Sequence, residues 1–118
     1  MRPETAAALY DMSQAADRIV EATEGKAFDD YQSDWYFQSA VERQFEILGE
    51  ALARIRDLER SIFEQIPEAA KVIALRNIII HGYDAIDPRV LWAIVEQRLP
   101  ELRTLLSRLL EEARRQGL

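Results

Sequence analysis

Apolar residues recur at intervals of three and four along the chain, and no segment alternates apolar and polar residues. The first spacing places apolar side chains on one face of an α-helix, whereas a half-buried strand needs the second. Only four glycines and four prolines are available to interrupt helices among 118 residues. The sequence therefore predicts an all-α protein, an antiparallel bundle of four to five helices, in which residues 1–118 form a single domain.

Signals for helix starts and stops divide the chain into five predicted helices, since prolines favour first turns and glycines favour ends. The predicted helices cover about residues 4–22, 34–58, 67 to the neighbourhood of 81 or 83, 88–100 and 101–115. Asp87 is the expected N-cap of the fourth helix, and Pro100 either kinks that helix or separates it from the fifth. The stretch KAFDDYQSD is predicted to be a polar connection that ends in an N-cap at Ser33 or Asp34. Residues 59–66 are ambiguous.

The charge balance is acidic, with 21 Asp and Glu residues against 15 Lys and Arg and a formal net charge of −6. Such a chain does not capture nucleic acid by broad attraction to phosphates, so any contact with RNA has to be local. Cysteine is absent and there is one histidine, which excludes a disulfide framework and argues against a zinc site. No apolar run is long enough to span a bilayer and no signal-peptide pattern is present, so we expect a cytoplasmic protein without membrane contact.

The third predicted helix carries an arginine on its apolar side. On a helical wheel, the arc that faces a core contains Val72, Leu75, Arg76, Ile79, Ile80 and Tyr83. A guanidinium keeps its charge when it is buried, so Arg76 needs an anionic partner. A salt bridge to Glu46 or Glu50 of the second helix would supply one.

Asn77 and the only histidine, His81, lie four residues apart on the opposite side of this helix, where their neighbours are alanines. Small side chains allow another helix to pack closely, for example one from a second copy of the chain. A half-exposed histidine that the helix dipole favours at a C-terminus is the alternative interpretation of His81. Arg76 and His81 are about 140° apart on an ideal helix, so they converge only if the helix unwinds near Gly82 or if two copies meet.

Residues 76–83, RNIIIHGY, match the pattern R-x-x-x-x-H-x-Y with a polar residue directly after the arginine. This pattern resembles the signature of the HEPN superfamily, in particular of the HepT toxins. Residues 40–55, AVERQFEILGEALARI, are similar to the family's helix with an E-I-x-G-E-A core. Residues 92–102, WAIVEQRLPEL, resemble the segment that leads through a proline into the last helix. The resemblance covers most of the chain after residue 33, in the same order.

The resemblance implies a helical bundle that forms a homodimer with both motifs facing a shared cleft, and a metal-independent ribonuclease that needs no cofactor. Arg76 and His81 would be the catalytic pair on the RNA substrate, and Asn77 the accompanying polar residue. In HepT systems the partner is an MntA-type nucleotidyltransferase antitoxin, which neutralises the toxin by transferring AMP to the motif tyrosine, here Tyr83. From the residues alone, Tyr83 is equally a ring that caps the core.

The side chains suit this chemistry. Histidine titrates near neutrality and moves protons, and arginine offers phosphate a planar, permanently charged fork. A function of a different class remains open, that of a non-catalytic HEPN-type adaptor that binds a nucleotide or a nucleotidyltransferase. The acidic composition favours this alternative, because a free ribonuclease gains from a basic cleft.

Two features of the second predicted helix have structural interpretations. Its apolar face consists of Phe37, Val41, Gln44, Leu48, Ala51, Leu52 and Ile55. On the other side, around Gly49, the carboxylates of Glu42, Glu46 and Glu50 form a row that we interpret as a solvated or arginine-paired face rather than a metal site. The aromatic residues 35–37, WYF, could stack on nucleic-acid bases, but an anchor in the core is the preferred interpretation.

Overall fold

The computed structural model describes residues 1–82 and 86–118, and all regular secondary structure within those ranges is helical. The helices are α1 (Pro3–Thr23), α2 (Phe28–Ser33), α3 (Trp35–Leu58), α4 (Arg60–Phe63), α5 (Ala69–His81), α6 (Pro88–Gln97) and α7 (Leu99–Arg115). The predicted all-α bundle is confirmed, and two short helices, α2 and α4, are added to it. No helix in this described part of the chain is both long and apolar enough to cross a bilayer.

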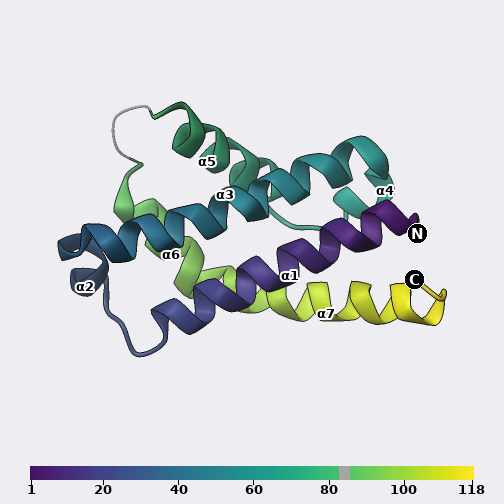
Figure 1. The fold of residues 1–118 in the computed structure, drawn as a ribbon, viewed down its shortest axis with the longest axis horizontal. Helices are drawn as coiled ribbons and strands as arrows, with labels where there is room; N and C mark the ends of the chain where they lie inside the picture. The colour runs from purple at the N-terminus through teal and green to yellow at the C-terminus, as the bar shows by residue number, and fades with distance from the viewer. Residues whose placement is uncertain (83–85) are drawn as a thin grey trace.

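Three long helices, α1, α3 and α7, run lengthwise and form the body of the molecule (Figure 1). α1 packs against both α3 and α7, and its direction is opposite to theirs. The two termini therefore lie at the same end, where the amine of Met1 donates a hydrogen bond to Oε1 of Gln116 at 2.9 Å. α5 packs on α3 from the side opposite α1. This arrangement makes α3 the central helix.

The central position of α3 buries two of its faces. Its buried residues are Val41, Phe45, Leu48, Gly49, Ala51, Leu52 and Ile55. Most of the predicted apolar face is thus confirmed. The prediction that Gly49 lies on the other, polar side is wrong, because a one-sided wheel does not anticipate a second neighbour, and α5 covers Gly49. Gln44 is only half-buried.

The stretch predicted as a polar connection contains the helix α2. Its two aromatic residues are three positions apart, so one helical turn directs both toward the core. Tyr31 is 2 % exposed and its ring stacks on that of Trp92 at 5.4 Å, while the Phe28 ring lies 6.5 Å from the same indole. Burial of this aromatic cluster explains why a polar, acidic segment becomes helical.

The predicted N-cap at Asp34 is confirmed. Its Oδ1 accepts hydrogen bonds from the backbone N–H groups of Tyr36 at 3.0 Å and Phe37 at 3.3 Å. The N-cap of α6 at Asp87 is confirmed in the same way, with its Oδ1 accepting from the backbone N–H of Arg89 at 3.0 Å. In both cases a short acidic side chain satisfies N–H groups that a helix leaves unpaired at its start.

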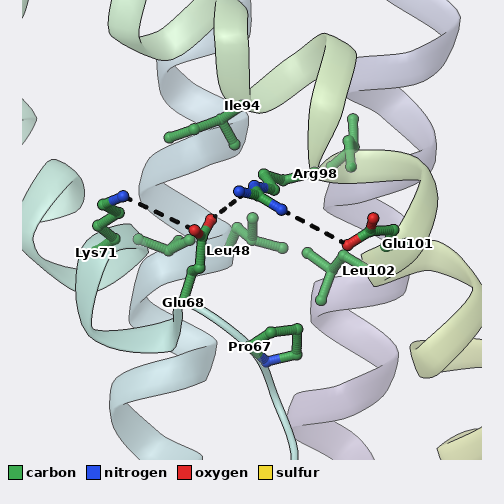
Figure 2. A pocket seen from close by; sticks show the side chains of 10 residues that line it. Leu48, Pro67, Glu68, Lys71, Ile94, Arg98, Glu101 and Leu102 are labelled. Carbon is green, nitrogen blue, oxygen red and sulfur yellow. Dashed lines mark ion pairs between the residues drawn. The ribbon is translucent and has the colours of Figure 1, made fainter.

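The predicted start of the third helix at Pro67 is wrong, because α5 begins only at Ala69. Glu68 precedes it in the left-handed conformation, with φ of +59°, which interrupts the helical path. The carboxylate of Glu68 lies between two cations, 3.2 Å from Nε of Arg98 and 3.7 Å from Nζ of Lys71 (Figure 2). These ion pairs compensate in part for a backbone conformation that costs roughly 1–2 kcal/mol in a non-glycine residue.

The other helix ends follow the sequence signals more closely. α5 ends at His81, one of the two predicted ends, and Gly82 caps it with φ of +62°, a conformation that glycine adopts without strain. α6 and α7 are separate helices, so the structure shows a break and not a kink, which were the two alternatives at Pro100. The break lies at Arg98, two residues before the proline. Pro100 lies in the first turn of α7, where no backbone donor is needed.

Loss of the α3 N-cap has a predictable cost. We expect Asp34→Ala to lower the free energy of unfolding by about 1 kcal/mol, because two backbone N–H groups lose their acceptor. Urea denaturation followed by circular dichroism measures the change. Asp57→Ala, near the other end of α3, is the matched control and should leave stability unchanged or slightly raised, since a carboxylate there opposes the helix dipole. Equal losses in the two variants would contradict the capping role.

Candidate functional site

Arg76 lies on the side of α5 that packs on α3. Its stem crosses the α3 backbone at Gly49, where a Cβ atom would overlap the Cβ of Arg76 and lie 2.8 Å from its Cγ. The same atom would be 3.4 Å from the carbonyl oxygen of Val72. Only a glycine therefore permits this approach of the two helices, and the space that its side chain would fill contains the arginine stem.

The guanidinium of Arg76 is held at two of its nitrogen atoms. Nη1 donates a hydrogen bond to Oδ1 of Asn77 at 2.8 Å, and Nη2 lies 3.8 Å from Oε1 of Glu50. The predicted salt bridge is thus confirmed for Glu50. Glu46 forms its ion pair with Arg43 on the same helix, at 3.0 Å.

The third nitrogen of Arg76, Nε, is buried and has no hydrogen-bond partner within the described residues. The side chain as a whole is 29 % exposed, so its charge lies at the boundary between the bundle and solvent. A buried donor without an acceptor costs about 1–3 kcal/mol, and native structures satisfy almost all such groups. Nη1 and Nη2 each carry a second N–H group, so the partly exposed guanidinium retains donors for an anion.

Asn77 and His81 are both exposed on the outer side of α5, as predicted. α5 remains helical through His81, so the backbone positions of Arg76 and His81 keep their separation of about 140°. The hydrogen bond to Asn77, however, draws the guanidinium around the helix toward the side that carries His81. Asn77 and His81 are four residues apart and adjacent on the helix surface.

The end of α5 exposes more apolar surface than predicted. Ile80, expected in the core, is 41 % exposed, and Ile78 is 40 % exposed, whereas Ile79 is half-buried and packs against the core. The fully buried residues of α5 all precede Arg76, so the last turns of the helix extend beyond the part that the core covers. Two isoleucines consequently flank the polar residues of the motif.

Tyr83, the residue predicted to accept AMP, lies outside the described residues. The chain is described up to Gly82, directly before it. Its predicted role and its alternative as a cap on the core both stay predictions.

The carboxylate row of α3 is arginine-paired at two of its three positions, which confirms that interpretation for Glu46 and Glu50. Glu42 differs, because it is half-buried and burial raises the pKa of its carboxyl group above the usual value. Burial likewise raises the pKa of the Tyr31 hydroxyl, and the negative charge of Glu42 raises this pKa further. Among the described residues no group of three or more His, Asp or Glu side chains could hold a metal ion.

The aromatic residues at the start of α3 do not share one environment. Phe37 anchors the core as predicted, edge-on to Tyr31 at 5.6 Å. Trp35 and Tyr36 are 75 % and 73 % exposed, so the core interpretation is wrong for both. Three consecutive residues of a helix spread over about 200°, and only one of them can face the core here.

The family match and the similar proteins found for this chain agree on one family. Residues 12–109 match the family described as Ribonuclease HepT-like. The chain is 34 % identical over 95 residues to "Putative RNase MJ1380" of Methanocaldococcus jannaschii, which covers 80 % of this chain and 86 % of the relative. It is also 34 % identical over 101 residues to "Probable ribonuclease HepT" of Thermococcus cleftensis, covering 86 % and 91 % of the two chains. No solved structure matches the chain.

The packing at Gly49 reverses the usual effect of replacing a helical glycine. Gly→Ala normally stabilises a helix by about 1 kcal/mol, but we expect Gly49→Ala to destabilise the protein by roughly 1–3 kcal/mol, because the new methyl group overlaps the Arg76 stem. Urea denaturation shows whether the substitution lowers or raises the free energy of unfolding. Ser39→Ala, at an exposed position of the same helix, is the control for helix propensity and should be neutral or slightly stabilising. A more stable Gly49→Ala protein would contradict the close approach.

Proposed function

This chain belongs to the ribonuclease HepT-like family, and we propose that it is the toxin of a HepT/MntA-type toxin–antitoxin pair, a metal-independent endoribonuclease with a HEPN motif. The observation that carries the proposal is the state of Arg76. Its guanidinium is oriented by Asn77 and Glu50, is partly exposed, and retains further N–H groups for an anion. A fixed, half-buried cation of this kind suits the phosphate of a nucleic acid.

The proposed reaction uses the 2′-hydroxyl of RNA as nucleophile. A base removes its proton, the 2′-oxygen forms a bond to phosphorus, the bond from phosphorus to the 5′-oxygen breaks, and that oxygen takes up a proton. His81 serves the proton transfers because an imidazole can both accept and donate a proton. Arg76 stabilises the negative charge on the phosphate oxygens, and Asn77 keeps the guanidinium on the histidine side of the helix.

A homodimer would complete this site. One helix separates the backbones of Arg76 and His81 by about 140°, and α5 does not unwind before Gly82. The outer side of α5 exposes two isoleucines next to the motif, together with alanines that leave room for a second helix. Two copies that meet at this surface would supply two histidines to one cleft, one for each proton transfer.

The second candidate function is a HEPN-type adaptor without catalysis, which binds a nucleotide or a nucleotidyltransferase. The observation in its favour is the acidic surrounding of Arg76, where Glu50 pairs with the guanidinium and Glu46 belongs to the same row. Carboxylates beside the only motif arginine weaken its attraction for a long polyanion. The binding of a single nucleotide depends less on such attraction.

Control by a nucleotidyltransferase fits the position of Tyr83 in the chain. α5 ends at His81 and is capped by Gly82, the residue directly before this tyrosine in the sequence. Its hydroxyl oxygen would attack the α-phosphorus of ATP, with pyrophosphate as leaving group and the phenolic proton going to a base. The attached phosphate would then compete with RNA for Arg76, which explains inhibition without a distant conformational change.

Cleavage of RNA by the purified protein in the presence of a metal chelator is the main test. We expect Arg76→Ala and His81→Ala each to lower the rate at least roughly 100-fold, because they remove charge stabilisation and proton transfer. Gel electrophoresis of a labelled RNA measures the rate, and thermal unfolding verifies the fold. Arg43→Ala, an exposed arginine of α3, is the matched control and should cleave normally. Intact RNA with the wild type would instead favour the adaptor.

Modification of Tyr83 is tested separately, with an MntA-type nucleotidyltransferase and ATP. We expect intact-mass spectrometry to show addition of AMP to the wild type and to Tyr36→Phe, which lacks another exposed tyrosine, but not to Tyr83→Phe. The modified protein should lose cleavage because the new phosphate occupies the cationic site. AMP on Tyr83→Phe would rule out this tyrosine as the acceptor.

A further inference from the structure

We propose that Glu50 is a positioning residue for the cleavage reaction, which acts by fixing the guanidinium of Arg76 and not by contacting RNA. This inference rests on the proposed ribonuclease function. Glu50 lies on α3 next to Gly49, and its Oε1 is 3.8 Å from Nη2 of Arg76 on α5. The two neighbouring residues of α3 thus contact the same arginine, one at its stem and the other at its charged end.

Arg76 is held at three points along its length. The stem rests on Gly49, Nη1 donates to Asn77 at 2.8 Å, and Nη2 is attracted by Glu50. A long, flexible side chain loses much of its rotamer freedom in such a setting before any substrate arrives. A donor that is already oriented stabilises a developing charge without reorganisation during the reaction. Glu50 is the only one of these three contacts that carries a charge.

The ion pair of Glu50 differs from that of Glu46 in the same carboxylate row. Glu46 pairs with Arg43 three residues earlier on the same helix, and this arginine is 59 % exposed. Glu50 reaches across to another helix and pairs with a side chain that is only 29 % exposed. Both pairs are partly open to solvent, since the carboxylates of Glu46 and Glu50 are 24 % and 43 % exposed, so the two pairs differ mainly in the arginine that each carboxylate engages. Glu46 therefore offers a carboxylate of similar position without a connection to the motif.

The charge of Glu50 determines in which direction its removal should change the cleavage rate and the affinity for RNA. A carboxylate beside Arg76 repels an RNA phosphate that approaches the same guanidinium, so Glu50 does not strengthen the binding of RNA. The separation of 3.8 Å exceeds that of a hydrogen bond, so the hold on Nη2 is mainly coulombic. Removal of the charge should therefore release the guanidinium and slow cleavage, while RNA binds as well as before or more tightly.

Glu50→Gln removes the charge with little change in size, and Glu46→Gln is its matched control. With a labelled RNA oligonucleotide, we expect Glu50→Gln to lower kcat roughly 10- to 100-fold with KM unchanged or lower, as for a misplaced catalytic group. Glu46→Gln should change neither constant. In proton–nitrogen NMR spectra the Nε–H signal of Arg76, assigned with Arg76→Lys, should shift and exchange faster with solvent in Glu50→Gln, but not in Glu46→Gln.

The outcomes separate the possible failures. A raised KM with unchanged kcat would assign Glu50 to RNA binding and overturn the proposal, as would equal effects of the two substitutions. Slower cleavage with an unchanged Arg76 signal would also overturn it, since Glu50 would then not act through the arginine. If Glu50→Gln unfolds, Glu50→Asp, which keeps the charge but shortens the reach, takes its place, with a lower kcat and an unchanged KM expected. A wild type that leaves RNA intact contradicts the ribonuclease function, and the NMR comparison then decides alone whether Glu50 fixes Arg76.

Discussion

The stem of Arg76 lies where α3 has no side chain, at Gly49, and the geometry of the candidate site depends on this contact. A Cβ atom there would push α5 away from α3 and move the guanidinium outward. Because α1 covers the other side of α3, the central helix cannot simply shift to make room. The close packing of the bundle thus determines how deep the Arg76 side chain lies. The position of the motif on α5 therefore depends on Gly49 of α3.

Depth and partners together determine what the cation can do. A fully exposed arginine would be screened by water and salt, whereas a fully buried one would need a tightly bound carboxylate. Arg76 lies between these limits, with one carboxylate at 3.8 Å and one neutral amide at 2.8 Å. Its charge is oriented without being fully neutralised. The proposed function requires a local site for phosphate on a chain with a net charge of −6, and the field that matters for such a site is the one within a few ångströms of one guanidinium.

Sequence patterns predicted the long helices and their caps, because periodicity and capping are local properties. Asp34, Asp87 and Gly82 occupy the positions that their residue types suggest. The features that were missed depend on neighbours distant in sequence. Gly49 is buried because a second helix covers α3, Tyr31 is buried because Trp92 lies opposite it, and Ile80 is exposed because the core ends before α5 does. A helical wheel contains none of this information.

The same distinction explains the relation between Arg76 and His81. A wheel places side chains by the direction of their Cα–Cβ bonds, and by that measure the two residues are about 140° apart. Arginine is long enough to depart from this direction, and its hydrogen bond to Asn77 takes the guanidinium toward the histidine side. Lysine at position 76 would have a similar reach, but as a compact charge it lacks the planar fork that engages Asn77 and Glu50 through separate nitrogens. The polar residue after the arginine thus fixes the guanidinium beside an amide that is adjacent to His81 on the helix surface, which is a physical reason for its place in the pattern.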